Sequence, residues 1–172
     1  MRGQGKSPPR SSICDIVWSW IGSFLGIASV ALLNYKLLAE SDAMLLIGSF
    51  GASAVLIFGV VSGPLSQPRN LLGGHFISAL VGVTMLQIFS DTLWLAAALA
   101  VSVSIFLMHL TRTLHPPGGA TALIAVIGSA KIHALGYMYA LVPVTAGAFV
   151  MLVVALIVNN IPAKRQYPKF WW

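Results

Sequence analysis

An otherwise apolar chain is interrupted by the pentapeptide His-Pro-Pro-Gly-Gly at residues 115–119, which leads directly into the apolar run 120–130. Two consecutive prolines cannot lie inside a regular helix, because each lacks an amide proton and clashes with the preceding turn. At membrane depth, the polar backbone freed by such a break must be buried in protein or face a wet cavity. Breaks of this kind are where membrane transporters tend to form their binding sites.

The composition indicates which solvent surrounds the chain. Hydrophobic residues form 58% of the 172 residues and charged residues only 8%, with a mean hydropathy of +0.88. Soluble globular domains carry about 25% charged residues, and a chain of this length cannot hide so much apolar surface in one core. Because the apolar runs are continuous and do not alternate with polar residues, a β-barrel is excluded. The composition therefore predicts a polytopic α-helical membrane protein.

Six apolar segments follow one another along the chain: 18–38, 43–62, 71–89, 92–110, 120–130 and 134–158. A membrane span needs about 20 residues, so five of the segments are long enough. The fifth is short, and it is expected to form a half-helix, a re-entrant piece or a tilted, broken span.

The chain also contains an internal repeat. Residues 51–57 (Gly-Ala-Ser-Ala-Val-Leu-Ile) match residues 119–125 (Gly-Ala-Thr-Ala-Leu-Ile-Ala), and each match opens the second segment of a set of three. A repeat with an odd number of crossings must be inserted upside down relative to its twin. The alternative explanation for the repeated small residues is close helix packing, which small residues permit in lipid. The fold class expected is an all-α membrane protein with two inverted three-helix repeats, whose second helices are broken or short.

The domain boundaries follow from this pattern. We expect a cytoplasmic basic tail at 1–14, a transmembrane domain at 15–160 and a basic, aromatic cytoplasmic tail at 161–172. The first repeat covers about 15–90 and the second about 91–160. With six crossings and both termini in the cytoplasm, eight of the ten Lys and Arg residues face that side, leaving Lys36 and Lys131 opposite. This distribution agrees with the positive-inside rule.

Cationic and hydroxyl side chains near the breaks are candidates for binding an anion. Arg69 and Arg112 are expected on one face of the membrane, one in each repeat, and guanidinium groups suit small oxyanions. The alternative is that both arginines only contact lipid headgroups. His75 lies just inside the third segment, where it can donate to an anion, carry a proton or pack against a carbonyl.

The two small-residue helix starts supply the other candidates. Small residues at a helix N-terminus leave amide protons open to an anion. Hydroxyl groups there can complete an anion site or bond back to their own helix. These candidate substrate-binding residues are Ser49, Ser53, Gly119 and Thr121.

The break itself is expected to be mainly structural. We expect His115 to brace the chain beside Pro116, Pro117 and Gly118, in preference to contacting a substrate directly. The acidic residues Asp15, Glu40, Asp42 and Asp91 all lie at segment ends or in loops. A cation pathway or an acid-based proton relay uses a buried carboxylate, so their placement favours an anionic or neutral substrate.

Other classes of function lack their usual signatures. The only cysteine, Cys14, excludes an internal disulfide framework and a thiol-based metal cluster. The sequence has no His-Glu-x-x-His, Gly-x-Ser-x-Gly or phosphate-loop motif. We expect no enzyme activity, no cofactor, no metal site and no nucleic-acid partner.

Residues 111–123, Thr-Arg-Thr-Leu-His-Pro-Pro-Gly-Gly-Ala-Thr-Ala-Leu, resemble the signature of the HPP family of integral membrane proteins. The resemblance extends to residues 51–54 and to 67–75, and it covers roughly residues 15 to 160. Descriptions of that family usually give four spans, whereas the charge pattern here favours six crossings.

The resemblance carries functional implications. HPP members of plants and cyanobacteria have been linked to nitrite transport, which implies a small-anion transporter here, with nitrite as the expected substrate. The rival hypotheses are a small-anion channel and a non-transporting membrane scaffold or sensor. We expect a homo-oligomer, because so short a chain has little protein to enclose a wet pathway. A bacterial, cyanobacterial-type inner membrane is favoured over the chloroplast inner envelope, since no transit peptide is visible.

Overall fold

The computed structural model describes residues 9–37 and 47–172, and all regular secondary structure in those ranges is helical. Four helices are long and apolar enough to span a membrane: Ile13–Lys36 within α1 (Ile13–Leu37), α3 (Pro68–Ile88), α4 (Leu93–Leu110) and Ala140–Val158, which ends in α7 (Ala146–Val158). Two apolar helices are shorter. They are Ser49–Gly59, which consists of α2 (Ser49–Ala54) and the π-helical turn Val55–Gly59, and α5 (Pro116–Ile127).

The order long, short, long therefore occurs twice along the chain. All six predicted apolar segments contain helices, and the second and fifth form the short ones, as the repeat pattern predicted. The expectation that segment 43–62 is long enough to span was wrong, because its helix covers only Ser49–Gly59. The helix ends where Val60 leaves helical geometry (φ −125°, ψ 53°), just before Gly63 and Pro64. Residues 43–46 lie outside the described ranges.

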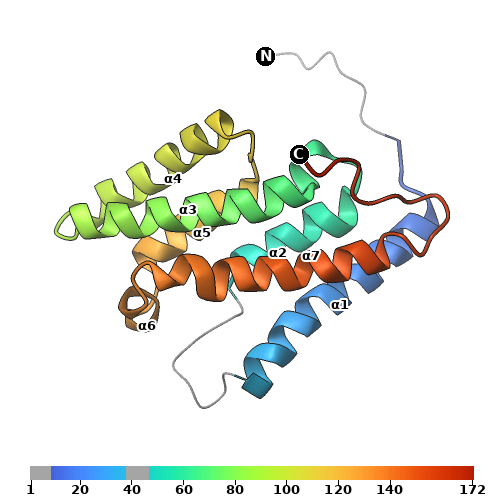
Figure 1. The fold of residues 1–172 in the computed structure, drawn as a ribbon, viewed down its shortest axis with the longest axis horizontal. Helices are drawn as coiled ribbons and strands as arrows, with labels where there is room; N and C mark the ends of the chain where they lie inside the picture. The colour runs from blue at the N-terminus through green and yellow to red at the C-terminus, as the bar shows by residue number, and fades with distance from the viewer. Residues whose placement is uncertain (1–8, 38–46) are drawn as a thin grey trace.

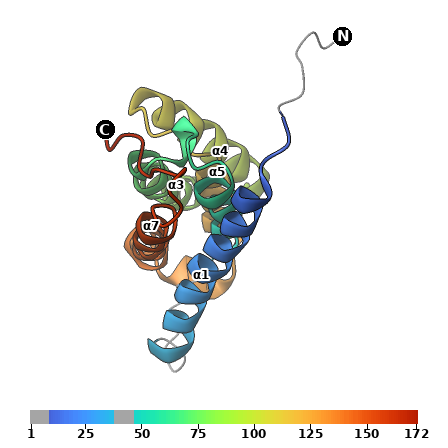
Figure 2. The ribbon, with the colours of Figure 1, turned by 90° about the vertical axis from the view of Figure 1, so that its right-hand side faces the viewer.

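The long helices form two groups around the short ones (Figures 1 and 2). Helix α3 packs against α4 and α5, and α1 packs against α7. In the end-on view of Figure 2, α1 and α7 lie below α4 and α5. A small helix, α6 (Ala130–Ala134), and a kink at Val142 (φ −129°, ψ 119°) connect α5 to α7.

The two short helices run antiparallel through the middle of the fold. Ser49 at the start of α2 contacts Thr121, which lies six residues into α5, whereas Ser53 contacts His115 immediately before α5. Because the residue numbers rise in one helix as they fall in the other, the two N-terminal turns pass each other in opposite directions. The same opposed directions are visible in Figure 1. The inverted relation between complete repeats stays a prediction.

Glycines let α3 approach α5 closely. A Cβ atom added at Gly118 of α5 would lie 2.7 Å from Ser78 Oγ and 2.9 Å from the Gly74 carbonyl oxygen of α3. Further along the same contact, a Cβ atom added at Gly82 of α3 would lie 2.5 Å from the Ala122 carbonyl oxygen of α5. These distances are shorter than van der Waals contact, so side chains at these positions would push the two backbones apart. Small residues have this role in many membrane helix pairs.

This packing yields a stability prediction for neighbouring glycines. Gly118→Ala should destabilise the protein by about 1–3 kcal/mol, because the new methyl group overpacks the α3–α5 contact. Gly119→Ala is the matched control, since its Cβ would meet only Val101 Cγ1 at 3.8 Å. Thermal unfolding of detergent-solubilised protein measures both. Equal melting temperatures for the two variants would contradict the proposed close contact.

Candidate functional site

A buried polar cluster lies where the two short helices cross beside α3. It consists of five side chains, hereafter the serine–histidine cluster: Ser49, Ser53, His75, His115 and Thr121. Each is at most 1% exposed. The α2 helix supplies the serines, α3 supplies His75, and α5 with its N-cap residue supplies Thr121 and His115.

Hydrogen bonds join these five side chains into one chain. Thr121 Oγ1 donates to Ser49 Oγ at 2.8 Å and lies 2.7 Å from His75 Nδ1. The other nitrogen of His75, Nε2, is 2.7 Å from Ser53 Oγ. Ser53 Oγ is in turn 3.0 Å from His115 Nε2. At the end of the chain, His115 Nδ1–H donates to the Leu65 carbonyl oxygen at 2.8 Å.

Local sequence explains this placement. Pro116 and Pro117 occupy the first two positions of α5, where the missing amide protons cost no helical hydrogen bond. His115 is therefore held just outside the helix in an extended conformation (φ −142°, ψ 105°). Its ring meets the His75 ring edge-on, with centroids 5.0 Å apart, and Phe50 contacts the other side of His75 at 5.4 Å.

The cluster offers hydrogen-bonding groups but no fixed charge. Hydroxyls and neutral imidazoles both donate and accept, and the first turns of α2 and α5, which carry the partial positive charge of helix N-termini, contribute residues to this region. The described acidic residues lie elsewhere: Asp15 pairs with Arg165, and Asp91 is exposed in the turn between α3 and α4. Glu40 and Asp42 lie outside the described residues. Chemically, the cluster suits an anion or a mobile proton.

The structure brings together four of the seven predicted substrate-binding residues: Ser49, Ser53, His75 and Thr121. The predicted bracing residue His115 joins them, and it bonds both the Leu65 carbonyl and Ser53. Gly119 is partly exposed on α5 and has no contact with the cluster among the hydrogen bonds described.

The two predicted arginines lie outside the cluster. The Arg69 guanidinium donates to the Thr111 carbonyl oxygen, next to the exposed Arg112. The two residues therefore lie close together on the surface of the molecule, and their placement on one face of the membrane stays a prediction. Arg112 adopts a left-handed conformation (φ 56°), which L-residues with a Cβ rarely occupy. The loop continues through Leu114, whose carbonyl accepts from Asn70 Nδ2 at 2.8 Å, to His115.

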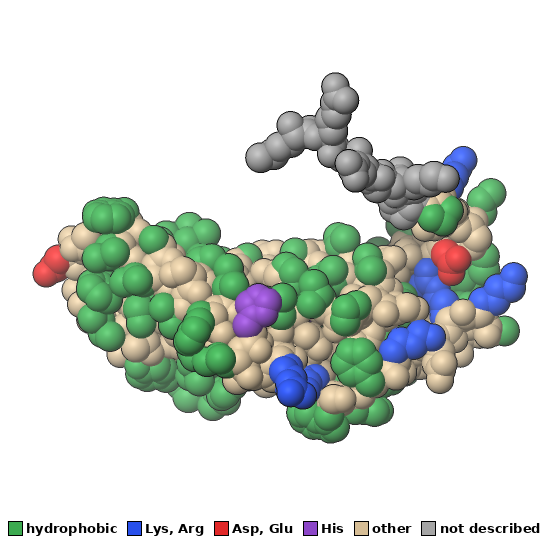
Figure 3. All heavy atoms as spheres, turned by 90° about the horizontal axis from the view of Figure 1, so that it is seen from above, with side chains coloured by type: hydrophobic (Ala, Val, Ile, Leu, Met, Phe, Trp, Pro, Cys, Tyr) green, Lys and Arg blue, Asp and Glu red, His purple; other side chains and the backbone are tan. Residues whose placement is uncertain are grey.

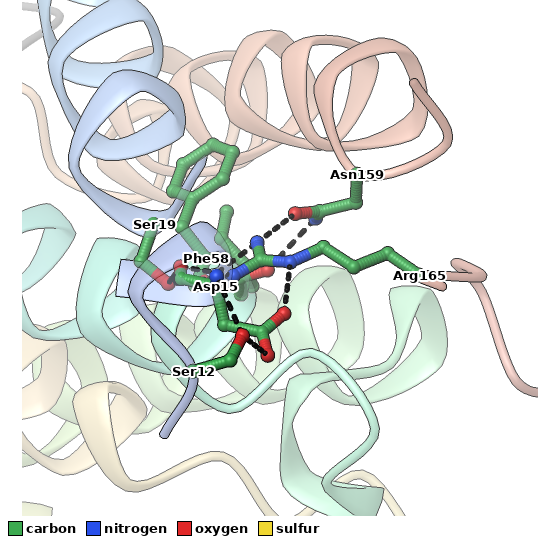
Figure 4. Close-up of polar contacts among 7 residues, drawn as sticks. Ser12, Asp15, Ser19, Phe58, Asn159 and Arg165 are labelled. Carbon is green, nitrogen blue, oxygen red and sulfur yellow. Dashed lines mark hydrogen bonds and ion pairs between the residues drawn. The ribbon is translucent and has the colours of Figure 1, made fainter. Parts of the chain in front are cut away.

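Sequence reasoning missed a second polar cluster at the opposite end of the short helix Ser49–Gly59 (Figure 4). The Arg165 side chain is only 7% exposed, and its guanidinium donates to Asp15, Ser19, the Phe58 carbonyl and Asn159. Cations stabilise helix C-termini, where carbonyl groups lack partners. From the sequence, the basic C-terminal tail was expected only to orient the protein in the membrane. No feature of the sequence distinguished Arg165 from the exposed Lys164.

A polar and an apolar hollow border the short helix Ser49–Gly59. A polar cavity of about 350 Å³ is lined by the loop 59–63 together with Asp15, Lys164 and Arg165. An apolar hollow of about 340 Å³ lies on the outer face of the crossing, between Ala52 and Val55 of one short helix and Pro116 and Ala120 of the other. No member of the serine–histidine cluster lines either hollow. Within the part of the chain that the structure describes, no three His, Cys, Asp or Glu side chains gather as a metal site would require.

Comparison with known proteins identifies the family. The family model described as "HPP, transmembrane region" matches residues 8–168. The chain belongs to the HPP transmembrane family. No solved structure matches it.

Two curated relatives, both transmembrane proteins of Dictyostelium discoideum, are similar to almost the entire chain. One is 50% identical over 99% of this chain and 56% of its own length, and the other is 48% identical over 99% of this chain and 60% of its own length. The chain thus spans somewhat over half the length of these relatives. An integral membrane protein follows from the family and the apolar helices, while the particular membrane stays a prediction.

The Arg165 cluster can be tested by stability. Arg165→Ala removes the donor to the Asn159 side-chain oxygen, the ion-pair partner of Asp15 and one of the two donors to the Phe58 carbonyl, so its melting temperature should fall by roughly 5–10 °C. Arg165→Lys should recover little of this, because an ammonium group cannot reach so many acceptors in one plane. Lys164→Ala is the control, since that side chain is exposed. An unchanged melting temperature for Arg165→Ala would show that the cluster adds nothing to stability.

Proposed function

We propose that this HPP protein transports a small monovalent anion, and that nitrite is its substrate. The observation that carries the proposal is the crossing of two short helices, whose N-terminal turns meet at the serine–histidine cluster. Broken helices with opposed N-termini form the substrate sites of several transporter folds. The cluster is the proposed binding site, with Ser49, Ser53, His75 and Thr121 as donors.

Electrostatics favours an anion over a cation. The helix N-termini carry partial positive charge, and the described acidic side chains lie away from the cluster. Arg112 lies on the surface of the loop that leads to His115, and Arg69, in the first turn of α3, donates to the same loop, so both can attract anions toward the site. A site made mainly of dipoles binds weakly enough to release its ion, as transport requires. Nitrite itself is inferred from the resemblance of residues 111–123 to the HPP signature.

The proposal extends to the arrangement in the membrane. The repeated order of helices supports two inverted repeats, although only four helices in the described ranges are long enough to span. On the face shown in Figure 3, Lys and Arg side chains lie at the right-hand end and near the middle but not at the left-hand end, whereas acidic side chains occur at both ends. This asymmetry supports cytoplasmic termini by the positive-inside rule. We also propose a homo-oligomer, in which the apolar hollow on the outer face of the crossing lies against a second copy.

A carrier fits the site better than a channel. Both nitrogen atoms of both clustered histidines have hydrogen-bond partners within the protein. An ion must therefore displace internal hydrogen bonds, which is a conformational step that limits turnover. A channel would move thousands of ions per second or more, so the measured turnover separates the two.

Transport can be measured directly with purified protein in liposomes. Nitrite uptake should exceed that of protein-free liposomes, and competition by nitrate, formate and bicarbonate should rank the anions. Ser53→Ala should reduce uptake at least tenfold, because Ser53 links both histidines. Ser102→Ala, in an exposed position on α4, is the matched control. If reconstituted protein moves none of these anions, the scaffold or sensor hypothesis replaces transport.

The conformation of Arg112 allows function to be separated from stability. Arg112→Gly removes the guanidinium while relieving a left-handed conformation that glycine adopts freely. The variant should therefore be at least as stable as the parent, yet take up nitrite several-fold more slowly. Arg112→Lys restores the charge and shows whether paired donors matter. Undiminished uptake by Arg112→Gly would remove this residue from the pathway.

A further inference from the structure

The number of protons held by the hydrogen bonds of the serine–histidine cluster depends on the direction of one of them, the bond between Thr121 and Ser49. Five bonds link the Leu65 carbonyl, His115, Ser53, His75, Thr121 and Ser49. Each needs one proton. The two neutral imidazoles, Ser53 and Thr121 together provide four. With Thr121 donating to Ser49, the Ser49 proton is not part of these five bonds, and the fifth proton must be added.

One added proton completes the five bonds in that direction. If either histidine is an imidazolium, all five bonds are made with Thr121 donating to Ser49. If both histidines are neutral, Ser49 must donate to Thr121 instead, and each following bond is then made in the order Ser49, Thr121, His75, Ser53, His115. The two arrangements of the same heavy atoms differ by one proton, and passing from one to the other reverses the Ser49–Thr121 and Thr121–His75 bonds.

We propose that the serine–histidine cluster binds one proton together with each transported anion, so that transport is electroneutral. This inference rests on the proposed anion transport and names its coupling ion. A buried charge is costly unless it is paired. A protonated cluster carries one positive charge and a monovalent anion carries one negative charge, so each offsets the desolvation cost of the other.

Among residues 9–37 and 47–172, the surroundings of the cluster offer no competing charge. The α2 helix contributes Phe50 beside the serines, and α4 contributes Met108, which contacts Ser78 of α3. The loop before α3 contributes the Leu65 carbonyl. One further ionisable side chain contacts the cluster residues: the Tyr139 hydroxyl donates to the Thr121 carbonyl oxygen at 3.1 Å, and it is therefore neutral. The imidazoles of His75 and His115 are thus the groups that would hold the proton.

The geometry also supplies a path for the proton. Alternating hydroxyl and imidazole groups separated by 2.7–3.0 Å can pass a proton along the chain by successive transfers. The chain ends at the Leu65 carbonyl, which accepts the His115 proton and does not pass it on. Because no cluster residue lines the polar cavity of about 350 Å³ beside residues 59–63, exchange of the proton with water requires the site to open.

Proton uptake on binding is the first test. Adding pH-matched nitrite to detergent-solubilised protein in weak buffer should raise the pH, with about one proton taken up per anion bound. Adding sodium gluconate, whose anion is too large for the site, is the control for salt effects. Nitrite binding without proton uptake would overturn the inference while leaving anion transport standing.

Driving-force measurements in liposomes provide the second test. An inward proton gradient should accelerate nitrite uptake several-fold, after subtraction of protein-free liposomes, and an imposed membrane potential should change it little. Uptake that follows the potential and ignores the proton gradient overturns proton coupling alone. Absence of uptake under every condition overturns both this inference and the proposed function.

A histidine variant distinguishes a proton site from a structural residue. In His75→Asn, any remaining nitrite uptake should follow the membrane potential and lose its response to the proton gradient. His109→Asn is the matched control, because His109 is exposed on α4 and should leave both responses unchanged. If His75→Asn does not fold, as judged by size exclusion, the proton-uptake experiment on the unmodified protein decides the question. If nitrite uptake by His75→Asn still responds to the proton gradient, the proton is bound by a group other than His75.

Discussion

Two helix beginnings inside an apolar body create the problem that the rest of the structure solves. The chain itself supplies partners for the first amide protons: Phe50 and Gly51 bond to the carbonyls of Ile47 and Gly48, and Gly118, which follows two prolines without amide protons, bonds to the carbonyl of His115. The polar side chains between the two turns bond to one another in the serine–histidine cluster. Because each of them has a partner, serine, threonine and histidine are accommodated in an otherwise apolar core.

The remaining architecture positions this cluster. Glycines at positions 74 and 82 of α3 and 118 of α5 bring the two backbones close enough for His75 to reach Thr121. At the other end of the short helix Ser49–Gly59, Arg165 and Asn159 bind the terminal carbonyl groups of Phe58 and Ile57. Both ends of that helix are therefore fixed by polar contacts, and its length need not match the membrane thickness.

Much of this organisation was predictable from local sequence. The prolines at 116 and 117 predicted the start of α5, and the repeated Gly-Ala-hydroxyl-Ala pattern predicted that Ser53 and Thr121 begin paired helices. Contacts between residues that lie far apart in the sequence were not predictable. The His75–Thr121 contact depends on how α3 packs on α5, and the role of Arg165 depends on the end of a π-helical turn more than 100 residues earlier in the chain. Neither of these contacts produces a periodic pattern that a single sequence would show.

The position of the charges gives the mechanism its physical basis. The predicted arginines lie at the surface, so the buried site holds no permanent cation to balance an anion. A permanent buried cation would bind its ion tightly and, once empty, would be left unpaired at a large desolvation cost. Two histidines joined through a serine avoid both problems, because the positive charge can arrive with the anion and leave with it. The empty site then returns to a neutral, fully hydrogen-bonded state, in which the protein can change conformation without moving charge across the membrane.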